Sequence, residues 1–274
     1  MDTEDHSTSA NPPLLRPVAP RLDWDDLVFD DNVSTQLREI EARWRDRDAV
    51  LNHWGMRRRL KSDGLLALFT GEPGTGKTEA ASVIAAQLGL TLCQVSTAAL
   101  LSKYIGETEK NIEQVLSIAE AKANIALVFD EAEALFAKRV DARGSVEIAH
   151  SSQISLLLSR LERFSGLVFL TTNHTALIDT AFKRRFHVFV EFRMPGPELR
   201  AQIFRLALAE APVADDLDDR LFDDGEYSGG SIQNVVLNAA FLARRRGGSM
   251  ITNDDLQEAL SREAHKMGRL VQSR

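Results

Sequence analysis

The chain has 274 residues, of which 44% are hydrophobic and 27% charged, and its formal net charge is -7. These values are typical of a soluble globular protein that buries a sizeable core. The acidic balance disfavours a general nucleic-acid or membrane-surface binder, because such proteins need an excess of Lys and Arg. A single cysteine, Cys93, excludes an intrachain disulfide. No apolar run reaches the length of a membrane helix, and the acidic N-terminus is unlike a secretory signal, so we expect a cytoplasmic protein.

The first 21 residues are rich in Ser, Thr, Pro and charge, which predicts a disordered arm with order beginning near Leu22. Between about Asn32 and Arg59 the apolar positions recur with helical spacing, which indicates a helical approach to the core. The basic runs at 56–61 and 244–246 could contact a partner, although charge runs are more often solvated faces. The scattered histidines lack metal-ligand spacing, so we expect no structural metal.

Five short apolar runs follow, alternating with amphipathic stretches: LLALFT, LTLCQVS, IALVFD, LVFLTTN and HVFVEF. Runs that are apolar at consecutive positions suit strands covered on both faces, and the alternation predicts a five-stranded parallel sheet with helical crossovers. Beyond Pro195 and Pro197 we expect three helices, at 198–211, 231–246 and 252–267, with capping residues at Ser231 and Thr252. The predicted fold class is α/β, with a three-layer αβα core at 22–194 and a small all-α lid domain at 195–274.

The strongest motif is GEPGTGKT, between the first apolar run and a helical stretch; its members are Gly71, Glu72, Pro73, Gly74, Thr75, Gly76, Lys77 and Thr78. A triphosphate needs many backbone N–H donors in a small volume, and a glycine-rich turn at a helix N-terminus supplies them. Lys77 would add positive charge at the β and γ phosphates, and the Thr78 hydroxyl could ligate Mg²⁺. The motif predicts a P-loop that binds ATP; a mere loop is the weaker alternative.

A second motif lies in IALVFDEAEALF, where an apolar run ends in Asp130 and Glu131. The carboxyl ends of parallel strands carry the ligand site in open α/β sheets, so this pair should lie beside the phosphate loop. Asp130 could hold Mg²⁺ through water, and Glu131 could take a proton from the attacking water. The alternative is a pair of acids that only stabilises a helix N-terminus.

Two further segments add polar side chains to this picture. Asn173 ends the run LVFLTTN, and its neutral amide could orient the attacking water, although Asn at a strand end is also ordinary turn chemistry. Arg184 and Arg185 precede the last run. Because they are far along the chain from the phosphate loop, they are better placed to act on a neighbouring subunit's phosphates than on their own, and surface ion pairing is the alternative.

In order, these segments resemble the AAA+ ATPases, and within them the AAA clade of ring-forming unfoldases and disassembly machines; the resemblance runs from about Trp24 to about Lys266. It implies that Gly71 to Thr78 are Walker A, that LVFDE is Walker B and that Asn173 is sensor 1. It further implies that Arg184 and Arg185 are arginine fingers, although here they adjoin, and this leaves the principal finger open. Asp26 lies in WDDLV, which resembles the segment beside the adenine, and YSGGSIQNV resembles a lid helix without a sensor 2 arginine.

The segment SKYIGETEKNI resembles the first pore loop of that clade, with Lys103, Tyr104 and Ile105 at its centre. An aromatic ring at the mouth of a pore can grip a polypeptide without sequence preference. Tyr104 could instead pack beneath its own helix. The polar stretch at 138–145 could form a second central loop, on spacing alone.

The sequence thus predicts an ATPase that uses ATP and Mg²⁺. Its resemblance to the AAA clade implies a homo-oligomeric ring, a hexamer, that remodels a protein substrate or works with an adaptor. Two other functions stay open: an AAA+ switch or assembly factor that threads nothing, and a DNA-associated AAA+ motor. Net acidity disfavours the DNA motor, and the loop around Tyr104 disfavours the switch. The segment before the motor is short, so substrate choice would depend on the arm, an adaptor or the ring face.

Overall fold

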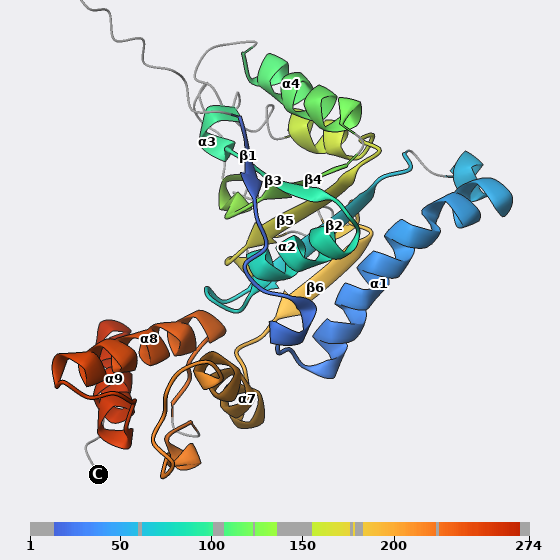
Figure 1. The fold of residues 1–274 in the computed structure, drawn as a ribbon. Helices are drawn as coiled ribbons and strands as arrows, with labels where there is room; N and C mark the ends of the chain where they lie inside the picture. Colours follow the sequence, from blue (N-terminus) through green and yellow to red (C-terminus); the bar gives the residue numbers. More distant parts are fainter. Residues whose placement is uncertain are drawn as a thin grey trace, which may run out of the picture.

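The computed structural model describes residues 14–268 except 60–61, 101–106, 123, 136–154, 176–177, 179–182 and 223–224. Its centre is a six-stranded sheet in the order β1-β3-β4-β5-β2-β6 (Figure 1). The strands are β1 (Leu15–Val18), β2 (Leu65–Gly71), β3 (Thr91–Val95), β4 (Ile125–Phe129), β5 (Leu167–Thr172) and β6 (Val188–Phe192). Strands β2 to β6 pair in parallel, as the apolar runs predict.

The sixth strand corrects two expectations, the five-stranded sheet and the disordered arm at 1–21. β1 lies inside that arm and pairs antiparallel with β3, from Leu15 opposite Val95 to Val18 opposite Leu92. A four-residue strand that contains Pro17 carries little pattern of its own, and Pro is tolerated because β1 is at the edge of the sheet. Order therefore begins before Leu22, since backbone pairing with β3 stabilises a segment whose composition alone would not.

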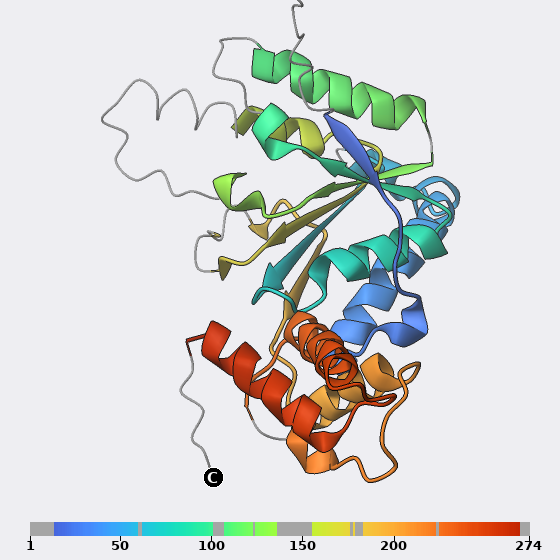
Figure 2. The same cartoon turned by 60° about the vertical axis from the view of Figure 1, so that its left-hand side comes forward.

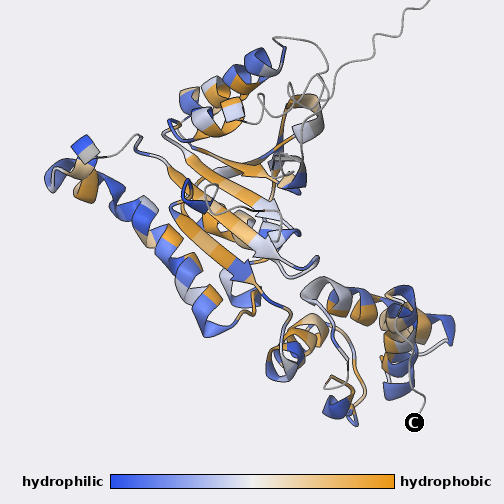
Figure 3. Ribbon diagram, turned by 180° about the vertical axis from the view of Figure 1, so that it is seen from behind, coloured by the Kyte–Doolittle hydropathy of each residue, from blue (hydrophilic) through white to orange (hydrophobic). Residues whose placement is uncertain are grey.

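Helices cover both faces of the sheet, as a three-layer fold requires (Figures 1 and 2). On one face lie α1 (Asp31–Asp48) and α2 (Lys77–Gln87), and on the other lie α4 (Glu107–Ala121) and the helical stretch at 155–161. Strand β2 shows why: Leu65, Ala67 and Phe69 pack into the cluster with α1 and α2. The alternate residues Leu66 and Leu68 pack into the cluster with α4. Consecutive apolar residues of a strand thus pack into hydrophobic clusters on opposite faces of the sheet. The strands are the most hydrophobic part of Figure 3.

The helical approach before the core is less regular than expected. Asp30 is the N-cap of α1, and its side chain accepts a hydrogen bond from the Val33 N–H. After Asp48 the helix passes into a π-helical turn, Ala49–His53, and a separate 3-10 turn, Met56–Arg59. The core also holds the 3-10 turns Trp24–Asp26 and Ala132–Leu135 and the short helix α3 (Thr97–Leu100).

The C-terminal residues form a small group of helices, called the lid below, beside the carboxyl ends of the strands (Figure 2). It contains α7 (Pro197–Leu208), a 3-10 turn (Asp219–Phe222), α8 (Gly229–Arg245) and α9 (Asn253–Lys266), packed around a cluster that includes Phe204, Phe222 and Ile232. Thr252 is the N-cap of α9, as expected. The expected cap at Ser231 is wrong: Ser228 is the N-cap of α8, because its hydroxyl accepts from the Ser231 N–H.

Cys93 is buried in β3, and burial raises the pKa of its thiol. This position suits a core side chain better than a nucleophile, which needs the thiolate. Among the helices that the structure describes, none is both long and apolar enough to cross a membrane.

Candidate nucleotide-binding and catalytic site

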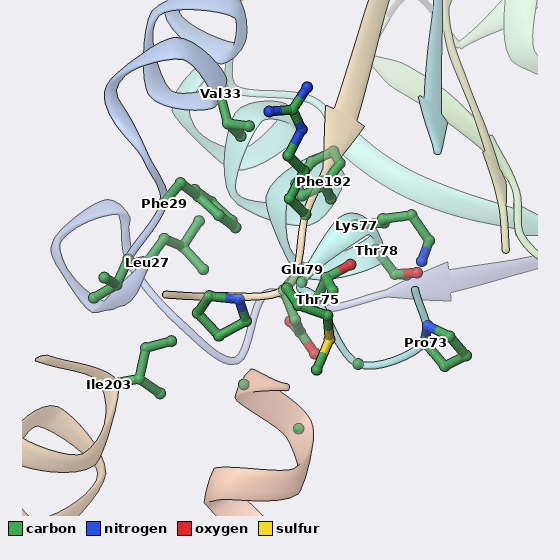
Figure 4. A pocket seen from close by; sticks show the side chains of 18 of the residues that line it. Leu27, Phe29, Val33, Pro73, Thr75, Lys77, Thr78, Glu79, Phe192 and Ile203 are labelled. Carbon is green, nitrogen blue, oxygen red and sulfur yellow. The ribbon is translucent and has the colours of Figure 1, made fainter. Parts of the chain in front are cut away.

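A cavity of about 350 Å³ opens at the carboxyl ends of the strands, between the core and the lid. The phosphate loop, the segment from Asp26 to Asp30, the end of β6 and the first turn of α8 form its walls (Figure 4). Strand order explains the position, because β5 lies between β4 and β2 and so three polar strand ends adjoin. The predicted residues that line this cavity are Asp26, Pro73, Gly74, Thr75, Gly76, Lys77, Thr78, Asp130, Glu131 and Asn173.

The phosphate loop has the backbone that its glycines permit. Gly74 and Gly76 have φ angles of 76° and 93°, a left-handed region that is costly for other residues. Gly76 is the N-cap of α2, so the free N–H groups of the first helical turn and the positive end of the helix dipole face the cavity. This arrangement suits a bound phosphate chain.

Lys77 is buried at the base of the loop, where its ammonium group is held by three oxygens. Nζ donates to the carbonyls of Gly71 and Glu72 and to Oδ1 of Asn173, each at 2.8 Å. Burial lowers the pKa of Lys77, while Asp130 and then Glu133 oppose that shift by attraction. Gly71 and Glu72 do not line the cavity; they supply acceptors that hold the lysine in place.

The carboxylate pair at the end of β4 meets the phosphate loop directly. Thr78 Oγ1 donates to Asp130 Oδ1 at 2.8 Å, and the buried Thr171 hydroxyl donates to the same oxygen. A hydroxyl and a carboxylate that converge in this way are oxygen ligands of the kind that Mg²⁺ takes beside substrate phosphates, so the residues fit that ion.

Glu131 has an unusual backbone for its residue type. Its φ angle is 49°, the one positive value among the non-glycine residues that the structure describes, and its N–H donates to Thr171 Oγ1 at 3.1 Å. Such a conformation costs on the order of 1 kcal/mol and persists where surrounding contacts fix it. The exposed Glu131 side chain lines the cavity, where a general base for water must lie.

Asn173 lies between the two motifs, because β5 separates β2 from β4. Its N–H donates to Glu133 Oε1 at 2.7 Å, and Thr172 Oγ1 donates to the same oxygen at 3.1 Å. Sequence reasoning missed Thr171 and Glu133. Their signals were present, since LVFLTT ends in hydroxyls and DEAE places a third acid after Asp130.

The opposite end of the cavity is apolar and suits a base. Leu27, Phe29 and Ile203 lie there, with Ile203 contributed by the lid helix α7 (Figure 4). The Asp26 side chain accepts from the Asp23 N–H at 2.8 Å, so it closes its own 3-10 turn. Asp26 therefore forms part of the cavity wall, while its carboxylate is hydrogen-bonded to the Asp23 N–H.

The lid contacts the phosphate loop through small residues. The Gly230 N–H donates to the Gly74 carbonyl at 2.9 Å, and a Cβ atom on Gly74 would lie 2.5 Å from Ser228 Oγ. Gly74 is thus required both for its φ angle and for this close approach. A movement of α8 would act directly on the loop.

Arg184 and Arg185 do not line the cavity. Both are exposed, and Arg185 Nη1 forms an ion pair with Glu162 Oε1 at 3.1 Å within its own chain. Lys103, Tyr104 and Ile105, and the second loop expected at 138–145, lie outside the described residues. The structure therefore places the phosphate loop, Asp130, Glu131 and Asn173 around one cavity. Arg184 and Arg185 lie outside it.

Comparison with known proteins agrees with this geometry. Residues 67–194 match the family model described as "ATPase family associated with various cellular activities (AAA)". A relative that is 30% identical over 71% of the chain agrees with this match. The chain belongs to the AAA ATPases. The matched part of this AAA chain contains the phosphate loop, the β4 carboxylates, Asn173 and the two arginines.

Relatives of this AAA protein include proteasome-activating nucleotidase of Saccharolobus solfataricus, 30% identical over 203 residues, which is 71% of this chain and 52% of that protein. Katanin p60 ATPase-containing subunit A1 of Strongylocentrotus purpuratus is 35% identical over 193 residues, 65% of this chain and 37% of that protein. The 26S proteasome regulatory subunit 6A of Saccharomyces cerevisiae is 30% identical over 203 residues, which is 71% of this chain and 47% of that protein. The chain thus spans about half the length of the relatives it matches, or less.

Proposed function

We propose that this protein hydrolyses ATP in a homo-oligomeric ring, as a hexamer, and uses the resulting lid movement to remodel a protein substrate. The observation that supports this proposal best is the cavity that joins the phosphate loop, Asp130, Glu131 and Asn173 with a lid helix hydrogen-bonded to Gly74. Nucleotide bound there would touch core and lid together, so its hydrolysis could change their relation.

In the proposed reaction the chain's own groups divide the work. The loop N–H groups and Lys77 bind the β and γ phosphates, and Glu131 takes the proton from the attacking water that Asn173 orients. Thr78 directly and Asp130 through water would hold Mg²⁺, which neutralises phosphate charge when bound. The base would lie against Leu27, Phe29 and Ile203.

The arginine pair supports shared sites, because it lies outside its own cavity. Arg185 already has a partner in Glu162, whereas no ion pair of Arg184 is found among the described residues. We infer that Arg184 is the principal finger and contacts the phosphates of a neighbouring subunit. Arg185 stays paired with Glu162 of its own chain.

The proposed pore loop that grips the substrate consists of Lys103, Tyr104 and Ile105. The names of two relatives, the proteasome-activating nucleotidase and the proteasome regulatory subunit, support an action on proteins. Replacing Tyr104 by Ala should abolish stimulation of ATP turnover by an unstructured polypeptide such as casein, because the aromatic grip is lost. ATP binding should persist, since the phosphate loop is unchanged. The measurement is ATPase rate against casein concentration.

The alternatives predict other outcomes of the same assay. If casein has no effect on either protein while ATP and ADP forms differ in partner binding, the non-threading switch is favoured. If duplex DNA stimulates turnover in a strongly salt-dependent way, the DNA motor replaces both. Glu120→Ala, an exposed change on α4 outside the segment SKYIGETEKNI, provides the matched control.

A further inference from the structure

Glu133 is a titratable residue beside the site to which neither motif assigns a task. It lies in the 3-10 turn Ala132–Leu135, three residues after Asp130, and it is half-buried. Its Oε1 accepts from the Asn173 N–H at 2.7 Å and from Thr172 Oγ1 at 3.1 Å. Both bonds cross from the end of β4 to the end of the neighbouring strand β5.

The residue held by Glu133 contacts the phosphate loop at its other end. Asn173 Oδ1 accepts from Lys77 Nζ at 2.8 Å, so Glu133, Asn173 and Lys77 form one hydrogen-bonded chain. A charged acceptor on a backbone N–H is among the stronger hydrogen bonds in proteins. The carboxylate therefore fixes the position of the residue whose amide oxygen contacts Lys77.

The same chain lets the Asn173 amide change partners when phosphate binds. Lys77 also bonds the Gly71 and Glu72 carbonyls, and it must turn from some of these acceptors to reach phosphate oxygens. Asn173 Oδ1 then becomes available to the attacking water. Its backbone stays fixed by Glu133, because that bond does not involve the amide side chain.

We propose that Glu133 is a positioning residue for hydrolysis, which holds the end of β5 so that the Asn173 amide stays aligned with the attacking water. This inference rests on the proposed ATP hydrolysis. Glu133 itself contacts neither the nucleotide nor the attacking water. It acts through its hydrogen bond to the Asn173 N–H. Misplacement of a positioned group by about 1 Å can cost roughly 100-fold in rate, so the effect belongs to kcat.

The test is steady-state ATPase kinetics of the full chain with Glu133→Ala, Glu133→Gln and Asn173→Ala. Glu133→Ala should lower kcat roughly 10- to 100-fold, with the Kd for a slowly hydrolysed ATP analogue changed less than about threefold, because the loop N–H groups remain. Glu133→Gln keeps an acceptor oxygen and should recover most of the rate. Glu258→Gln, on the half-exposed outer face of α9, is the matched control and should behave as wild type.

A double-mutant cycle separates positioning from general stabilisation. If Glu133 acts through Asn173, Glu133→Ala should add almost nothing to the loss caused by Asn173→Ala. Additive losses, a wild-type kcat in Glu133→Ala, or a fall in nucleotide affinity and thermal stability parallel to kcat would overturn the inference. Failure of the proposed function looks different, since wild type itself would then show no ATP turnover.

Discussion

Among single residues, His187 links the segment that carries the arginines to strand β2. Its N–H donates to the Leu66 carbonyl at 2.9 Å, and its ring Nδ1 accepts from the Leu66 N–H at 3.0 Å. The second bond requires a neutral ring with the proton on Nε2. Desolvation against the protein lowers the pKa of His187, and the charge of Arg43 lowers it further.

This geometry predicts a pH-dependent stability. Because the folded pKa of His187 is below its ordinary value of 6.5, the unfolded chain binds more protons in the interval between the two values. The free energy of unfolding should therefore fall as pH drops from about 6.5 through the folded pKa, and this contribution should be fully present above about pH 6.5. Urea unfolding between about pH 5 and pH 8 measures it.

The matched variants are His187→Asn and His265→Gln. Asn offers an amide oxygen near the position of Nδ1 without titrating, so this variant should lose the His187 part of the slope and keep most of the stability. His265 is exposed on α9, and its replacement should leave the slope close to that of wild type. An unchanged slope in His187→Asn would contradict the assignment.

At the scale of elements, the contact between α8 and the phosphate loop carries the proposed coupling of lid and nucleotide. A Cβ atom on Gly230 would lie 3.3 Å from Gly74 Cα, whereas one on Gly229 would meet its nearest neighbour at 3.5 Å. Gly230→Val should therefore push α8 off the loop, while Gly229→Ala should be accommodated.

Overpacking of this kind costs about 1–3 kcal/mol, so we expect Gly230→Val to weaken ATP binding by roughly 5- to 150-fold. Titration with a fluorescent ATP analogue measures this loss, and Gly229→Ala serves as the control. Equal affinities in Gly230→Val and wild type would mean that the lid does not act on the loop through this contact.

The elements also indicate what sequence reasoning can reach. The loop at 71–78, Asp130, Glu131 and Asn173 were predictable because each follows an apolar run and the parallel topology brings strand ends together. β1 was missed because its stability comes from pairing with β3, more than seventy residues away in the chain. The Glu133 bonds and the approach of Gly230 to Gly74 were missed for the same reason, since both join residues that no local pattern relates.

At the scale of the whole molecule, the proposed ring predicts complementation between defective subunits. A subunit with Arg184→Ala keeps its own Glu131, and a subunit with Glu131→Gln keeps its own Arg184. Each protein alone should lose ATPase activity, by about 1,000-fold or more for the finger. Mixed subunits should regain part of it, because an intact Glu131 then meets an intact Arg184 from its neighbour.

The measurement is the ATPase rate of the two proteins alone and after mixing, with mixed assembly checked by capture through a tag on one of them. Arg185→Ala is the comparison, and its defect should be the smaller one, because Arg185 is paired with Glu162 in its own chain. Mixed assemblies that stay inactive would contradict shared sites.

The proposed function requires that the phosphate loop binds ATP and that Lys77 contacts its phosphates. Equilibrium binding of labelled ATP with Mg²⁺ tests it most directly, using Glu131→Gln so that the nucleotide is not consumed. We expect saturable, magnesium-dependent binding, and a loss of roughly 10- to 150-fold in affinity when Lys77→Ala is added, since a charged hydrogen bond contributes about 1.5–3 kcal/mol. No saturable binding, or equal affinity with and without Lys77, would mean that this loop is not an ATP site.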